Sequence, residues 1–257
     1  PLIAALLGLL AIAGYLAAVY AYRRRYPHRL FPAPRIAAFA AGAVIGTIAI
    51  LPPVDALVDR SFTAHMLQHL VLALVAPPLI LLGAPLLLVL ALPPAHAGRT
   101  IARIVRHPIL QAFTLPVVSW LLFAAVLWGI HLSPTYNVAL DDGAVHALEH
   151  FALVASAMLF WMAVVQVGYA PYPLPFAARM FYLFWAIPQG AFLGLMIYSA
   201  RHVLYAHYLE GRSAAAALTD QQNAGALMWI GGGGLMFVAF MVTAAAWAAA
   251  ERTEAAV

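Results

Sequence analysis

Two pairs of histidines share the spacing that places side chains on one face of a helix. His65 and His69 form one H-x-x-x-H pair, and His146 and His150 form the other. Positions i and i+4 lie on the same helix face, so each pair can direct two imidazoles at one centre. Glu149 follows His146 by three residues and shares that face. Two such helix ends at the same depth supply four nitrogens and a carboxylate, which predicts a metal site.

The residue types around these pairs favour copper. Imidazole suits copper, zinc and iron, whereas a thioether favours reduced copper, and Met66 would add one if the start of its helix is irregular. The chain has no cysteine, which excludes disulfides, thiolate metal sites and thiol nucleophiles. Asp220 and Glu149 are carboxylates that we expect to bond to histidines and fix their tautomers. We therefore interpret the metal as copper.

Three further histidines are weaker candidate ligands. His131, His202 and His207 fall at the ends of predicted helices or in loops on the same side as the two pairs. A single histidine near a membrane interface is more often structural than a ligand, so both interpretations stay open for these three. Acidic residues gather on this side too, which favours a site for a cation there: Asp55, Asp59, Asp141, Asp142, Glu149, Glu210 and Asp220.

The composition indicates that the helices carrying these residues lie in a membrane. Of 257 residues, 65% are hydrophobic and only 9% are charged, against roughly 25% charged residues in soluble domains. We expect an all-α integral membrane protein, with residues 1–257 forming one domain of about seven transmembrane helices and no soluble module. Seven apolar segments approach the roughly 20 residues that a spanning helix needs: 2–22, 36–54, 64–90, 109–130, 145–167, 179–200 and 222–249.

Proline and glycine predict irregularities in three of these segments. Pro77 with Pro78, and Pro85, interrupt the third segment, so a kink or break is expected near Pro77. Pro188 predicts a kink in the sixth segment. The run 231–234 consists of four glycines and predicts close approach of another backbone.

The arginines indicate the orientation. All 13 basic residues are arginines, and ten of them fall in the connections 23–35, 91–108 and 168–179 or in the C-terminal tail, leaving three on the other side. Positive charge marks the cytoplasmic side, so we expect the N-terminus outside and the C-terminus in the cytoplasm. The apolar run 2–20 precedes its arginines, the reverse of a cleavable signal, and predicts a retained helix. The basic charge therefore predicts contact with membrane lipid and not with nucleic acid.

Several stretches resemble the multi-pass CtaG-like family of cytochrome c oxidase assembly factors. They are FTAHMLQHLVLALVAPPLILLGAPL (62–86), HLSPTYNVAL (131–140), HALEHFALVASAMLFW (146–161), LFWAIPQGAFLGL (183–195) and DQQNAGALMWIGGG (220–233). The resemblance implies a seven-helix protein of the bacterial cytoplasmic (inner) membrane that helps insert copper into the catalytic subunit of a haem–copper oxidase. It points to these residues: His65, His69, His131, His146, Glu149, His150, Tyr205, His207, Asp220 and Gln221.

The leading functional hypothesis is a copper-handling assembly factor and not an enzyme. Its expected partners are the catalytic subunit of a haem–copper oxidase and a periplasmic copper donor. The alternative is a membrane di-metal oxidoreductase that uses the same histidine pairs. A haem-binding cytochrome is disfavoured because further histidines cluster at the same end. A transporter is disfavoured because no charged residue lies clearly at mid-membrane.

Overall fold

The structure is a computed structural model that describes residues 2–93, 95–132, 138 and 142–255. These residues form helices joined by short connections, and no strand occurs among them. Asp141 and most of the stretch 131–140 lie outside the described residues. The helices are α1 (Leu2–Arg25), α2 (Ala33–Ala49), α3 (Pro52–Val58), α4 (Phe62–Leu70), η1 (Val71–Val75), α5 (Ala76–Leu82), α6 (Pro85–Ala91), α7 (Ala95–Val105), α8 (Pro108–Thr114), α9 (Pro116–Leu132), α11 (Gly143–Val165), α12 (Phe176–Ser199), η2 (Ala206–Leu209), α13 (Ala214–Ala226), η3 (Leu227–Gly232) and α14 (Gly233–Glu254).

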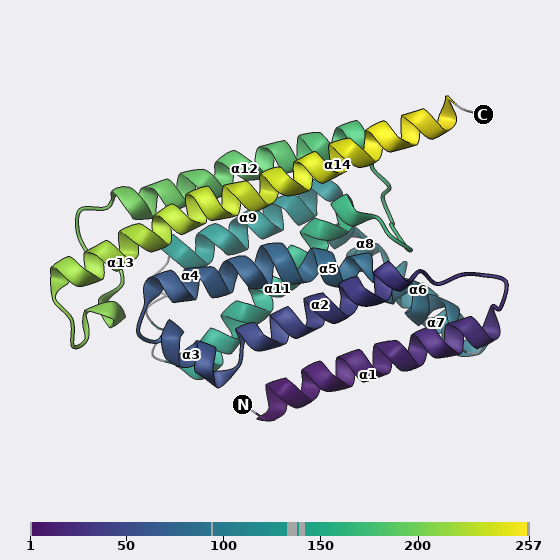
Figure 1. The fold of residues 1–257 in the computed structure, drawn as a ribbon, viewed down its shortest axis with the longest axis horizontal. Coiled ribbons are helices and arrows are strands. Elements are labelled where there is room, and N and C mark those ends of the chain that lie inside the picture. The colour runs from purple at the N-terminus through teal and green to yellow at the C-terminus, as the bar shows by residue number, and fades with distance from the viewer. Residues whose placement is uncertain (1, 94, 133–137, 139–141, 256–257) are drawn as a thin grey trace.

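The long helices run back and forth in one bundle, with α1 at its side (Figure 1). Within the part of the chain that the structure describes, five helical stretches are long and apolar enough to cross a membrane: Ala4–Arg25, Phe62–Leu82, Gly143–Val165, Phe176–Ser199 and Ala214–Glu254. The number rises to seven if the bent pairs α2–α3, with an angle of 54°, and α8–α9, with an angle of 71°, each count as one span. The expected fold class, an all-α bundle of about seven spanning helices, is therefore confirmed.

The helix ends separate into two groups (Figure 1). The start of α4, the end of α9, the start of α11, the end of α12 and the start of α13 meet at one end of the bundle, on the left in the view. The α1–α2 connection, α7, the start of α12 and the C-terminus lie at the other end. The histidine pairs and the arginine-rich connections therefore occupy opposite ends. The direction of the bundle across the membrane stays a prediction from the arginines.

The proline-containing span is irregular, and a side chain from another helix supplies a hydrogen bond that the proline cannot make. Pro77 has no N–H, so it cannot bond to the carbonyl of Ala73 four residues earlier. The indole Nε1 of Trp161, on α11, donates to that carbonyl instead, at 2.8 Å. A π-helical turn, η1, precedes the prolines, and the span continues to Leu82. The break comes later than expected, at Ala84 (φ 51°), immediately before Pro85 starts α6.

Among the described glycines, the closest approach of another backbone lies between α12 and the α13–η3 region. A Cβ on Gly194 would lie 2.7 Å from the nitrogen of Trp229, and a Cβ on Gly225 would lie 2.5 Å from the nitrogen of Tyr198. The glycine run 231–234 was expected to have this role. Its first two members instead face leucine side chains, and the last two have open space at the Cβ position. The closest approach is therefore at Gly194 and Gly225, followed by Gly42 on α2, where a Cβ would lie 2.9 Å from backbone atoms of Ala76 and Ile80.

Candidate metal centre

The start of α4 is held by a carboxylate from another helix. Asp220, on α13, accepts from the backbone nitrogens of Phe62 at 2.9 Å and Thr63 at 3.2 Å, and from the hydroxyls of Ser61 and Thr63. Arg212 donates to the same carboxylate at 3.0 Å. The first amides of a helix have no partner within the helix, and a carboxylate there also opposes the positive end of the helix dipole. Asp220 therefore anchors the turn that carries the first histidine.

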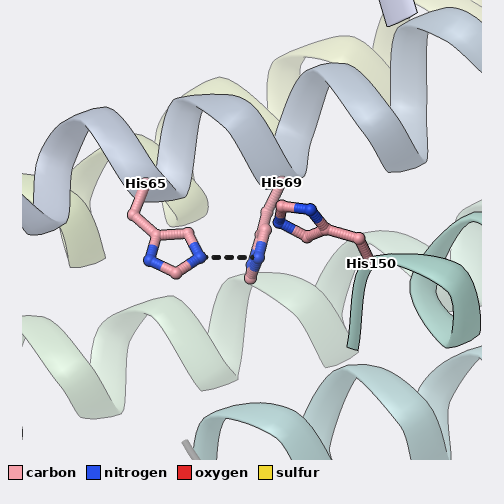
Figure 2. Close-up of side chains that lie close together, drawn as sticks. All are labelled: His65, His69 and His150. Carbon is pink, nitrogen blue, oxygen red and sulfur yellow. Dashed lines mark hydrogen bonds between the residues drawn. The ribbon is translucent and has the colours of Figure 1, made fainter. Parts of the chain in front are cut away.

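Three imidazoles from two helices converge next to this anchor (Figure 2). One nitrogen from each of His65, His69 and His150 lies within 4.8 Å of the others. The Nε2 atoms of His65 and His69, one helical turn apart on α4, are 2.9 Å from each other. Both of these side chains are buried, with 0% and 2% exposed. Ligand nitrogens this close together, away from solvent, fit a single metal ion.

Tyr208, in the short helix η2, fixes the orientation of His65. Its hydroxyl is 2.9 Å from Nδ1 of His65, and its side chain is buried. If Nδ1 carries the proton, it donates to the Tyr208 oxygen and leaves the lone pair of Nε2 for a metal. A hydrogen bond on the far nitrogen commonly orients a ligating histidine in this way. Tyr208 was not among the predicted site residues, because a lone tyrosine in a four-residue helix has no spacing signal that would single it out.

The second histidine pair and its glutamate complete the cluster. The ring of His146 lies 4.3 Å from that of His150 and 5.2 Å from that of His65, measured between centroids. Glu149 is 8% exposed, and one of its oxygens lies 3.4 Å from Nε2 of His69. The helix spacing places His146, Glu149 and His150 together on α11, where they meet His65 and His69 from α4.

Several of these buried polar atoms have no hydrogen-bond partner among the described residues. They include both oxygens of Glu149, Nδ1 of His69, and Nε2 of His146 and His150. Buried polar groups are nearly always bonded, and each exception needs an explanation. A bound cation is one that fits this donor set, because a carboxylate and neutral imidazoles are its usual ligands.

His131, at the end of α9, belongs beside this cluster. Its ring lies 5.6 Å from that of His69, and the side chain is buried. Its Nδ1 is 2.7 Å from the carbonyl oxygen of Leu127. A carbonyl can only accept, so Nδ1 carries the proton and Nε2 carries the lone pair. Tyr205 donates to the backbone carbonyl of His131 at 2.9 Å, and burial raises the pKa of the Tyr205 hydroxyl, which keeps this donor protonated.

The other predicted residues lie outside the cluster. His202 is exposed, and its backbone carbonyl accepts from the side chain of Gln221. His207 lies at the surface, with Nε2 3.3 Å from the carbonyl of Asp59. Asp220 was expected to fix a histidine tautomer, but its carboxylate is occupied at the start of α4.

Met66 is buried on α4 and lines a cavity next to His69. It lies within the helix and not at an irregular start, since Ser61 is the N-cap and accepts from the nitrogen of Ala64.

Comparison with known proteins adds an independent observation. Residues 13–250 match the cytochrome c oxidase caa3 assembly factor family (Caa3_CtaG). The chain belongs to this family. The match covers all the helices that carry the histidine cluster, and the expected resemblance is thereby confirmed.

Curated relatives match this chain over only part of their own length. An uncharacterized protein of Mycobacterium leprae is 27% identical over 84% of this chain and 34% of its own length. An uncharacterized protein of Mycobacterium bovis is 24% identical over 86% of this chain and 35% of its own length. The chain thus spans about a third of the length of the curated relatives it matches. No solved structure matches the chain.

Proposed function

We propose that this assembly factor binds copper at the histidine cluster of α4 and α11 and assists its insertion into the catalytic subunit of a haem–copper oxidase. The observation that carries the proposal is the convergence of His65, His69 and His150 within 4.8 Å, beside the buried carboxylate of Glu149. Family membership supplies the role in oxidase assembly.

The donor set suits a metal that is passed on. Imidazole nitrogens bind copper well, and the chain has no thiolate that would hold it permanently. His65, His69 and His150 would bind the ion, and Tyr208 would keep His65 turned toward it through Nδ1. Glu149 would offset part of the positive charge in a site with little water. Copper is here the cargo of the protein and not a catalytic cofactor.

A hollow at the surface offers a route to this cluster. It is lined by Asp59, His207, Glu210 and Tyr208, together with two arginines. Tyr208 lines this hollow and also contacts His65, so its side chain lies between the hollow and the cluster. The distribution of arginines predicts that this end faces the periplasm, where a copper donor would load the site. The oxidase subunit would receive the ion within the membrane.

Family membership does not favour the alternative of a membrane di-metal oxidoreductase. Histidine pairs at helix starts suit both functions, and the relation to oxidase assembly factors is the feature that separates them. Absorbance would also detect a haem protein directly, because bound haem gives a red preparation.

Copper analysis of the purified chain tests the binding step. We expect protein from copper-supplemented cells to contain copper, and a variant combining His65→Ala, His69→Ala and His150→Ala to lose it. His202→Ala is the matched control, because His202 is an exposed histidine at the same end of the bundle. Full copper binding by the triple variant would overturn the proposal.

A deletion strain tests the assembly step. We expect it to make the oxidase polypeptides and insert haem, while the catalytic centre lacks copper and activity is lost. External copper should restore part of the activity, since mass action can replace delivery but cannot replace an unrelated reaction. Copper-replete, fully active oxidase in the deletion strain would contradict the assembly role.

A further inference from the structure

A cavity of about 40 Å³ continues from the histidine cluster into the bundle. His69 and His131 lie on its wall, together with Met66, Met228 and Met236. An ordinary water needs about 10–15 Å³ of such space, so the cavity has room for a single ion and a change of ligands. His69 contacts both the cluster and the cavity. Its Nε2 lies next to His65, and its ring lines the cavity.

The methionines are placed along the cavity and not at one point. Met228, Gly232 and Met236 are spaced by four residues and all line it. Eight residues of helix correspond to a rise of roughly 12 Å, so the two sulfurs come from different depths of the bundle. Met66 approaches from α4, one residue after His65. Thioethers thus border the cavity from the histidine level inward.

The burial of these side chains separates them from the other methionines. Met66, Met228 and Met236 are 1%, 4% and 4% exposed. Methionine in a protein core usually fills gaps, because its side chain is flexible. Here three methionines border space that remains open, although interiors are otherwise close-packed. Packing alone leaves that space unexplained.

We propose that this cavity is a thioether subsite for Cu(I), in which the ion moves from His69 to Met228 and Met236. The inference rests on the proposed copper function and adds a ligand class and an oxidation state to it. Soft thioethers select Cu(I), whereas Cu(II) keeps to nitrogen and oxygen ligands. The transfer exchanges one neutral ligand for another, so no proton or electron has to move with the ion.

The test uses the full chain in lipid nanodiscs, loaded without oxygen with Cu(I) or, separately, with Cu(II). X-ray absorption should detect sulfur around Cu(I) and only nitrogen and oxygen around Cu(II). In a variant combining Met66→Leu, Met228→Leu and Met236→Leu, the sulfur signal should vanish and the Cu(I) capacity should fall by one ion per chain. Cu(II) capacity should stay unchanged. Leucine conserves side-chain volume, so the fold should tolerate these changes.

Met241→Leu is the matched control, because Met241 is on α14 but is 49% exposed and does not line the cavity. If the triple variant does not fold, Met236→Leu alone should reduce the sulfur signal, since this residue is the farthest along the chain from the histidine pairs. Nitrogen-only ligation of Cu(I) in the unaltered chain, with Cu(II) still bound, would overturn the subsite and leave the histidine site standing. Failure to bind copper in either oxidation state would overturn both.

Discussion

Replacing Asp220 by asparagine should loosen the first turn of α4, which carries His65 of the proposed copper site. The carboxylate accepts from five donors: the backbone nitrogens of Phe62 and Thr63, the hydroxyls of Ser61 and Thr63, and the guanidinium of Arg212. Asparagine has almost the same shape, but it offers one oxygen and turns the other position into a donor. At least one backbone N–H at the start of α4 must then lose its partner.

The size of the effect follows from these contacts. An unpaired buried N–H costs about 1–3 kcal/mol. The ion pair with Arg212 adds at most about 1 kcal/mol, because that arginine side chain is 31% exposed and solvent screens the pair. Together they give a loss of about 1–4 kcal/mol in the free energy of unfolding. This corresponds to a fall of about 2–16 °C in melting temperature for a chain of this size.

Asp142→Asn is the control. Asp142 is the N-cap of α11 and accepts from the nitrogens of Ala144 at 2.8 Å and Val145 at 3.3 Å through one oxygen. Asparagine and aspartate are nearly equivalent as N-caps, so this change should cost less than about 0.5 kcal/mol. Thermal unfolding of both variants in the same detergent gives the comparison, and amide hydrogen exchange should speed up at Phe62 and Thr63 only in Asp220→Asn. Equal melting temperatures for the two variants would refute the anchoring role.

Three further predictions test other parts of the structure. Tyr208→Phe should weaken copper binding about 10- to 100-fold in a competition titration, because His65 loses the bond that orients it; unchanged affinity would argue against this role. Gly225→Ala should lower the melting temperature, because its Cβ would lie 2.5 Å from a backbone nitrogen, whereas Gly234→Ala, with open space around its Cβ, should not. A reporter that is active only in the periplasm should work when fused at Asp142 and fail when fused in α7, and the reverse pattern would invert the orientation.

The local features of this protein could be predicted from the sequence because they depend on residues close together in the chain. Apolar runs of sufficient length predicted the spanning helices, since the cost of leaving backbone groups unbonded in lipid allows little else. The pairs His65 with His69 and His146 with His150 were also predicted from local sequence. A helix repeats every 3.6 residues, so side chains four positions apart lie on one face. Glu149 was predicted through its place on the same face as His146. The family resemblance also came from short stretches around these residues.

Contacts between helices were decided by packing, and no local pattern reports them. Which nitrogens of α4 and α11 meet depends on the depth at which the two helices pack, so the grouping of His65, His69 and His150 became visible only in the structure. The contact between Tyr208 and His65 also became visible only in the structure, because the two residues are 143 positions apart in the chain.

Asp220 shows where sequence reasoning failed. As a carboxylate near histidines it was expected to bond to an imidazole, but it satisfies backbone amides 157 and 158 positions earlier in the chain. The glycine run 231–234 was a strong local signal for close packing, whereas the close approach occurs at Gly194 and Gly225, where two helices cross. In each case the residue type was informative, but the partner was set by the tertiary fold, because only packing brings distant parts of the chain within bonding distance.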